Sequence, residues 1–378
     1  MTTFTKTIIG AVLAVAVATS LYQTHRVALL EAQIQAEQSQ AQDKGRDAFL
    51  RRLVAHGPPA PHLAASAPAA ESPSEERRVA NLYARILKGD VPRTTPQQLE
   101  GFLKENKRNA GSLLAAYHAT GDLAMLREAM EKYPNDPQVD FAAAFNAEGT
   151  PEERRHWLDA FKQSAPDNAL ANYLSALDYF KAGQTDQALQ ELAFGSHKGQ
   201  FQDYSASFVQ NGIEAYLGAG HSQAEAEMLA STQLPLPQLS QLKEFNQGIV
   251  DLAKSYQQNG DDTSAQALLK MDIELGQRFN GGPGESLVST LVGIAIQRSA
   301  LLAMDPNSPS PSGVPGQTVG DQINQLTQQR ETLKALSNQA EALMENMSDQ
   351  DFINYKNRWM ELGEENALRW VVEKYGNQ

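Results

Sequence analysis

The chain of 378 residues carries 32 basic and 45 acidic side chains, a formal charge of −13, and no cysteine. Without cysteine it has no disulfide, thiol nucleophile or thiolate zinc site. Nucleic-acid binding depends on Lys and Arg side chains that neutralise phosphates, so an acidic chain without a basic block is not expected to bind nucleic acid. Hydrophobic residues make up 41% of the chain, enough for one large helical array or two ordinary domains.

The first predicted element is an apolar segment. Residues 7–22 contain no charged side chain, Lys6 precedes them and Arg26 follows. A helix of that length spans about 24 Å, somewhat less than a hydrocarbon core of about 30 Å. Small residues at 16–18 fit a cleaved secretory signal, whereas direct continuation into helical sequence favours an uncleaved anchor, and a buried soluble helix is the third alternative.

We therefore expect residues 1–23 to be a membrane anchor or signal segment, with the anchor preferred. Either of these two alternatives places the rest of the chain across a membrane. The resulting prediction is a single-pass membrane protein whose bulk is periplasmic or extracytoplasmic. The balance of Lys and Arg around the apolar segment gives little information on its orientation.

Residues 24–56 predict a helical stalk, because Val27, Leu30 and Ile34 recur at helical spacing on one face. The stalk either forms a short coiled coil that makes the protein a homodimer or stands alone beside the membrane. Residues 57–75 are rich in Pro, Ala and Ser and hold few bulky apolar side chains. That composition predicts an extended linker.

The body of the chain, residues 76–304, predicts an all-α repeat array. An aromatic residue followed four positions later by Gly recurs along it, and helical sequence follows each Gly. Glycine permits a tight turn with positive φ between two helices. The pairs are Tyr117/Gly121, Phe145/Gly149, Tyr179/Gly183, Tyr216/Gly220 and Tyr256/Gly260.

Two of these units carry further small residues at fixed positions. One unit has Ala176, Tyr179, Gly183 and Ala188, and a later unit has Ala253, Tyr256, Gly260 and Ala265. These positions resemble the helix–turn–helix unit of tetratricopeptide repeats over roughly residues 110–270. The other units depart from the pattern, with Glu153, Arg154 and Leu126 where the family has small residues.

The resemblance implies a solenoid of stacked helix pairs whose first helices line a concave groove. In that family the groove binds a peptide or protein segment. By resemblance, the side chains that face the groove are Tyr173, Phe180, Lys181, Lys254 and Gln257.

The remaining elements complete the array. Residues 285–304 are apolar almost all round, but Arg298 interrupts them, so a central buried helix is favoured over a second membrane span. Residues 305–320, rich in Pro, Gly and Ser, predict a disordered loop. Residues 321–378 predict a C-terminal helical cap, in which Ser348 begins a helix with Asp351 as its capping-box partner. The alternative for the aromatic-rich last segment is a docking surface.

No catalytic, cofactor-binding or metal-binding residues are predicted. The sequence lacks H-E-x-x-H, G-x-S-x-G and a phosphate-binding loop. Ser240 and Lys243 fit an S-x-x-K pattern, but its companion motifs are missing. An enzyme is therefore not expected, and no cofactor is implied.

Three functions remain open. The preferred one is a membrane-anchored helical-repeat scaffold that mediates protein–protein interaction in a bacterial cell envelope. The second is a structural envelope spacer that self-associates through the stalk. The third is a helical-array enzyme with an unrecognised site in its groove.

Overall fold

The computed structural model describes residues 78–376, apart from 88–90, 93, 147, 235 and 280. The predicted anchor (1–23), stalk (24–56) and linker (57–75) lie outside the described residues. Every regular element within the described residues is a helix, and no strand occurs among them. The all-α prediction is therefore confirmed for this part of the chain.

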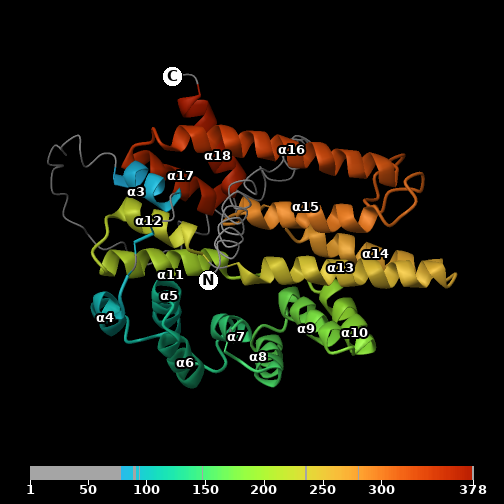
Figure 1. The fold of residues 1–378 in the computed structure, drawn as a ribbon, viewed down its shortest axis with the longest axis horizontal. Coiled ribbons are helices and arrows are strands. Elements are labelled where there is room, and N and C mark those ends of the chain that lie inside the picture. The colour runs from blue at the N-terminus through green and yellow to red at the C-terminus, as the bar shows by residue number, and fades with distance from the viewer. Residues whose placement is uncertain are drawn as a thin grey trace, which may run out of the picture.

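The first half of the described chain forms a row of helix pairs (Figure 1). After α3 (Arg78–Leu87) and α4 (Pro96–Glu105), each helix packs against the next within three pairs. The pairs are α5 (Ala110–Thr120) with α6 (Leu123–Lys132), α7 (Pro137–Ala144) with α8 (Pro151–Ser164), and α9 (Ala169–Lys181) with α10 (Thr185–Ser196).

The chain then reverses and covers part of this row. Helix α11 (Ser205–Gly218) packs on α4 and α5, and pairs with α12 (Gln223–Thr232). The long helix α13 (Pro237–Gln258) packs on α9, and is followed by α14 (Asp262–Gln277) and α15 (Leu287–Leu301). The first helices of two pairs, α5 and α9, are thus covered by helices of the same chain (Figure 1).

The last helices form a layer that packs on α12 and α15. They are α16 (Val319–Met344), α17 (Asp349–Leu362) and α18 (Glu364–Tyr375). Helix α16 contacts α15 and α18, and α17 contacts α12, while α3 packs against α12 and α17. The first described helix therefore lies beside the C-terminal helices (Figure 1).

All five aromatic–Gly pairs lie at turns between consecutive helices. Four of the glycines have positive φ, from 72° at Gly121 and Gly183 to 96° at Gly220, with Gly260 at 79°. Gly149 is not among the described glycines with positive φ. The turn there instead leads to Thr150, which begins α8 with a capping box to Glu153.

The predicted central helix is confirmed, since α15 buries Leu291, Ile294 and Ile296. Predicted disorder in residues 305–320 is wrong: Ser310 Oγ donates to Gln322 Oε1 at 2.6 Å, and Val319 N donates to Ser308 O at 3.0 Å. A Pro/Gly/Ser composition does not exclude order when polar side chains bridge the segment to a following helix.

Ser348 begins α17 as predicted, and its side chain accepts from the Asp351 amide. The predicted capping box is not completed, because the Asp351 side chain binds α18 instead of the Ser348 amide. The Asp351 carboxylate accepts from Lys374 Nζ and from Tyr375 Oη, both at 2.5 Å. Asp351 therefore links α17 to α18.

Among residues 78–376 as described, no helix combines the length and the hydrophobicity that crossing a membrane requires.

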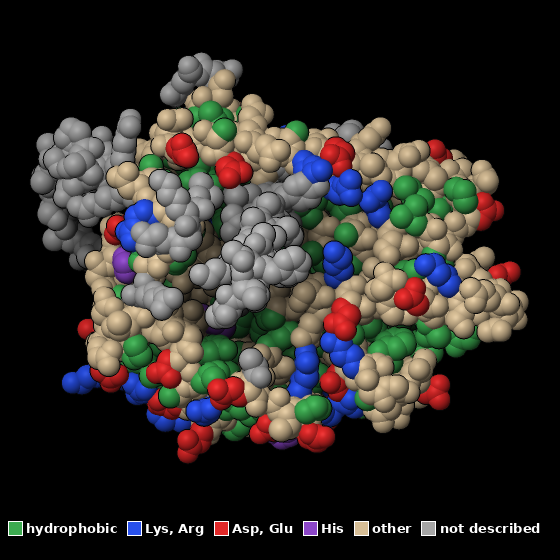
Figure 2. Space-filling model, in the orientation of Figure 1, with side chains coloured by type: hydrophobic (Ala, Val, Ile, Leu, Met, Phe, Trp, Pro, Cys, Tyr) green, Lys and Arg blue, Asp and Glu red, His purple; other side chains and the backbone are tan. Residues whose placement is uncertain are grey.

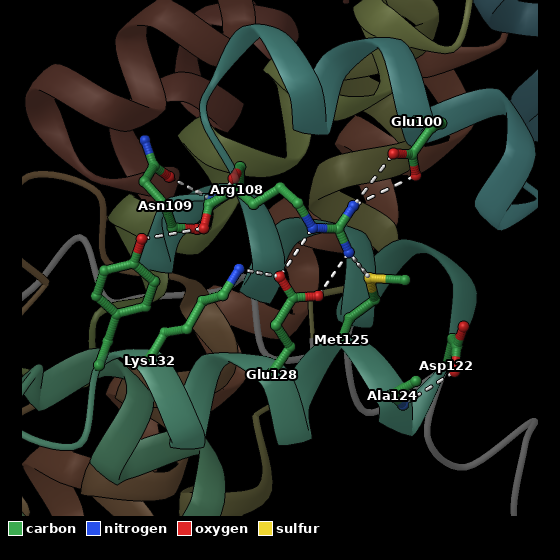
Figure 3. Close-up of polar contacts among 10 residues, drawn as sticks. Glu100, Arg108, Asn109, Asp122, Ala124, Met125, Glu128 and Lys132 are labelled. Atoms are coloured by element: carbon green, nitrogen blue, oxygen red, sulfur yellow. Dashed lines mark hydrogen bonds and ion pairs between the residues drawn. The ribbon is translucent and has the colours of Figure 1, made fainter.

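A polar cluster holds the turn between α4 and α5 (Figure 3). Lys107 and Arg108 have φ of 53° and 48°, a conformation that costs about 1–2 kcal/mol for a residue with Cβ. The Arg108 guanidinium binds Glu128 through two hydrogen bonds of 2.8 and 2.6 Å and also meets Glu100 at 3.3 Å. The hydrogen bond from Arg108 lowers the pKa of Glu128 to about 2.

Candidate functional site

A cavity of about 840 Å³ lies where the α10–α11 connection meets the α14–α15 connection. Most of its lining comes from two segments, residues 199–207, which we call the first wall, and residues 281–289, which we call the second wall. Glu274 and Arg278 at the end of α14 also line the cavity. The volume lies within the range of small-molecule and peptide sites.

Asn168 holds the first wall by neutral hydrogen bonds. Asn168 Nδ2 donates to Gln202 O at 2.7 Å, and Gln202 N donates to Asn168 Oδ1 at 3.0 Å. Ala169 N donates to Gln200 O at 2.9 Å. Asn168 also begins α9 by accepting from Leu170 N, so one side chain fixes both the helix start and the wall.

Tyr204 in the first wall has φ of 57°, which is rare for a bulky residue. Such conformations cost about 1–3 kcal/mol and persist where packing fixes them. The Tyr204 ring lies 6.1 Å from the ring of Phe141 and 6.0 Å from that of Phe161. Aromatic contacts with α7 and α8 therefore fix the strained residue beside the cavity.

The second wall is attached to the turn between α17 and α18. Gly284 N donates to Trp359 O at 3.1 Å, and Trp359 Nε1 donates to Glu285 O at 3.1 Å. Glu364 N donates to the same Glu285 oxygen at 3.2 Å. At Gly363, with φ of 85°, an added Cβ would lie 2.6 Å from Gly281 O, so only glycine fits there.

Acidic side chains predominate among the charged residues of the cavity. Asp203, Glu274 and Glu285 line it, against Arg278. Asp203 accepts from Gln238 Nε2 at 2.8 Å, and Arg278 Nη2 donates to Ser196 O at 3.0 Å. Glu274 is half-buried, and within the described part of the chain its carboxylate makes no hydrogen bond or ion pair. A cationic group is the complement of such a lining.

The groove residues expected from the resemblance lie in three places. Tyr173 is fully buried, and a Cβ on Gly195 would approach its ring to 3.0 Å. Phe180 and Lys181 lie together against α13: the Phe180 ring is 5.7 Å from Phe245, and Lys181 Nζ is 2.7 Å from Glu244. At this position α13 of the same chain occupies the face of α9.

The other two expected residues lie on α13 itself. Lys254 Nζ is 3.9 Å from Asp251, and Gln257 Nε2 donates to Ala303 O at 3.0 Å. Lys181 also lines a second cavity of about 750 Å³, beside Arg154 and Gln241. None of the five expected residues lines the larger cavity.

Sequence reasoning missed the larger cavity because its two walls are distant in the chain. The glycine-rich sequence at 281–284 and the sequence "FQDY" at 201–204 both lie in connections between helices. Neither carries a signal that the α10–α11 connection returns the chain to this point.

No group of three or more His, Asp or Glu side chains with the geometry of a metal site occurs among the described residues. The Ser240 hydroxyl donates to Pro237 O at 3.0 Å in the first turn of α13, where a hydroxyl ordinarily serves the helix backbone. On the drawn face, acidic and basic side chains are mixed along the row of helix pairs (Figure 2).

Comparison with protein-family models found no match for this chain. Comparisons with curated proteins and with solved structures likewise found no match.

Proposed function

We propose that this protein is a membrane-tethered, tetratricopeptide-like scaffold of a bacterial cell envelope, and that it binds a segment of a partner protein in the larger cavity. Residues 7–22 provide the tether in this account. The bound segment carries a Lys or Arg side chain that reaches Glu274.

The observation that carries the proposal is the unpartnered, half-buried Glu274 in a cavity of about 840 Å³. A carboxylate that is partly removed from water without a partner loses hydration that a cationic ligand restores. The cavity also has room for several side chains of an extended segment. The aromatic rings of Phe201 and Tyr204 offer apolar contact beside the charge.

Two further observations support a binding role. The walls are irregular connections held on rigid helices, which is the usual setting of binding residues. The face of α9 that the repeat family uses for partners is covered here by α13, so a partner needs another surface. The larger cavity, which lies where the chain reverses after α10, supplies such a surface.

The test is to fill the cavity without disturbing the core. Ala206 lines the cavity and is exposed, so Ala206→Trp places an indole in the binding volume. Ala124 on α6 is also exposed and lies outside the cavity lining, which makes Ala124→Trp the matched control. Each full-length tagged variant is purified from detergent-solubilised envelopes, and co-purified proteins are quantified by mass spectrometry.

The proposal expects one or more proteins that co-purify with the wild type and with Ala124→Trp but are lost with Ala206→Trp. Glu274→Gln should weaken the same capture, and raised salt should do so as well. Equal capture by the two tryptophan variants would contradict binding in the cavity.

A further inference from the structure

Three ionisable side chains from α12, α17 and α18 interact electrostatically behind the second wall. Lys356 on α17 is almost fully buried, and its ammonium has no hydrogen-bond partner within the described residues. Its Nζ lies 3.2 Å from the centre of the Trp359 ring. Glu364 on α18 and Glu227 on α12 are the carboxylates whose charges act on it.

Glu364 connects this cluster to the cavity. Its Oε2 accepts from Leu287 N at 2.9 Å, and its Oε1 accepts from Tyr355 Oη at 2.9 Å. Leu287 is the first residue of α15 and belongs to the second wall. Because the amides at a helix start have no partner within the helix, a carboxylate there binds strongly.

The same turn holds the wall by its backbone. Glu364 N and Trp359 Nε1 both donate to Glu285 O, and Gly284 N donates to Trp359 O. Trp359 therefore touches the ammonium of Lys356 with its ring and the second wall with its indole N–H. A single residue, Trp359, therefore separates the Lys356 ammonium from the second wall.

We propose that the protonation state of the Lys356–Glu364 pair sets how tightly the second wall is attached to the α17–α18 turn. The pair thereby controls the width of the binding cavity. This inference rests on the proposed function only in naming that cavity as the site that is regulated.

The chemistry of Glu364 gives the direction. As a carboxylate it accepts from Leu287 N and Tyr355 Oη together. Protonation converts one oxygen into a donor and removes the negative charge from the start of α15. One of the two hydrogen bonds is then weakened or lost, so the wall is held less tightly at low pH.

Burial of Lys356 and partial burial of Glu364 place the change near neutral pH. Burial raises the pKa of Glu364, and the Leu287 amide, the charge of Lys356 and the Tyr355 hydroxyl oppose this less strongly. Burial lowers the pKa of Lys356, opposed by the charges of Glu364 and Glu227. The ordinary values are about 4.3 for Glu and about 10.4 for Lys, so both groups move towards neutrality.

The other ionisable groups around the pair come from neighbouring elements. Burial raises the pKa of Glu227 on α12. Burial also raises the pKa of Tyr355 on α17 and of Tyr83 on α3. Glu285 in the second wall binds the amides of Gly281 and Gly282 with its carboxylate. The two tyrosines stay neutral at neutral pH, so they do not contribute to the change of charge.

Hydrogen exchange of the full chain, read by mass spectrometry without any partner, tests the inference. Protection factors of residues 281–289 are measured from about pH 5 to about pH 9, after correction for intrinsic exchange, with α8 as the internal reference. In the wild type, protection of the wall should fall about fivefold as pH decreases, because a charged acceptor binds an amide more strongly than a neutral one.

Two variants assign the change to the pair. Glu364→Gln should keep the wall at its low protection at every pH. Lys356→Met removes the cation that lowers the pKa of Glu364, so the midpoint should move to higher pH. Glu244→Gln, at the surface pair with Lys181, is the matched control and should leave the profile unchanged.

A wall whose protection follows α8 at every pH in the wild type would overturn the inference, even if neither variant folds. An unchanged midpoint in folded Lys356→Met would also overturn it. Neither result depends on partner capture, so failure here and failure of the proposed function are separate outcomes.

Discussion

The two walls of the cavity are held by different physics. At Asn168 the first wall is held by neutral hydrogen bonds, and aromatic packing fixes Tyr204 within it. The Asp203 carboxylate of this wall accepts from Gln238 of α13. The second wall is attached through a glycine contact at Gly363 and a carboxylate, Glu364, beside a buried ammonium. A neutral attachment is constant with pH, whereas a charged one depends on it. One side of a binding cavity can therefore be fixed while the other responds to pH.

Gly363→Ala tests the attachment of the second wall and should have the largest effect. The new Cβ would meet Gly281 O at 2.6 Å, at a φ of 85° that disfavours any side chain. We expect a loss of about 3 kcal/mol in the free energy of unfolding, measured by denaturant titration. Gly101→Ala, at a helix position with nothing within 4 Å of the added atom, should instead stabilise by about 0.5–1 kcal/mol. Equal stability of the two variants would mean that the second wall is not closely packed on this turn.

Asn168→Ala tests the first wall. The variant loses the cap of α9 and two hydrogen bonds to Gln202. We expect the free energy of unfolding to fall by about 2 kcal/mol. The loss should be the same at about pH 6 and at about pH 8. A clear pH dependence of this loss would contradict the assignment of the Asn168 attachment as neutral.

Lys356→Met tests the second wall by stability. Burial lowers the pKa of Lys356 in the folded protein, so the folded state holds its proton less tightly than the unfolded state. The cost of the buried ammonium is fully present below the folded pKa and decreases as pH rises towards the ordinary lysine value. At low pH, where Glu364 is neutral, the variant should be more stable than the wild type by about 1–2 kcal/mol. At higher pH it leaves Glu364 without its cation, and the gain should shrink or reverse. A difference that is independent of pH would contradict the account.

Glu128→Gln tests a carboxylate whose pKa is lowered, in contrast to that of Glu364, which is raised. The hydrogen bond from Arg108 lowers the pKa of Glu128 to about 2 (Figure 3). Its contribution is therefore present above the unfolded value of about 4.3 and is lost as pH falls towards 2. The pair is partly exposed, so we expect only about 0.5–1 kcal/mol at neutral pH. The wild type and the variant should converge in stability in acid, as followed by urea titration at several pH values.

The local features of the fold followed from the sequence more readily than the long-range ones. The five aromatic–Gly pairs each mark a turn between consecutive helices, because a turn depends on a few neighbouring residues. Ser348 was recognised as the start of α17 for the same reason. The partner of Asp351 was not, because Lys374 and Tyr375 reach it from another helix.

The candidate site was not predictable in the same way. Tyr204 and Glu274 are brought together only because the chain reverses after α10 and places α11 on α4 and α5. The repeat resemblance directed attention to Phe180 and Lys181, which contact α13. Hydrophobic periodicity shows that a helix face is buried but not which helix covers it.

The most direct measurement is site-specific photo-crosslinking in intact cells, with a photoreactive amino acid at each of three exposed positions. Gln202 in the first wall and Gln277 at the end of α14 both line the cavity, and Glu131 on α6 lies outside its lining. We expect positions 202 and 277 to crosslink to the same partner and position 131 not to do so. Ala206→Trp should abolish both adducts. Crosslinks of equal yield from position 131, or adducts that persist in Ala206→Trp, would contradict the claim that this cavity is the binding site.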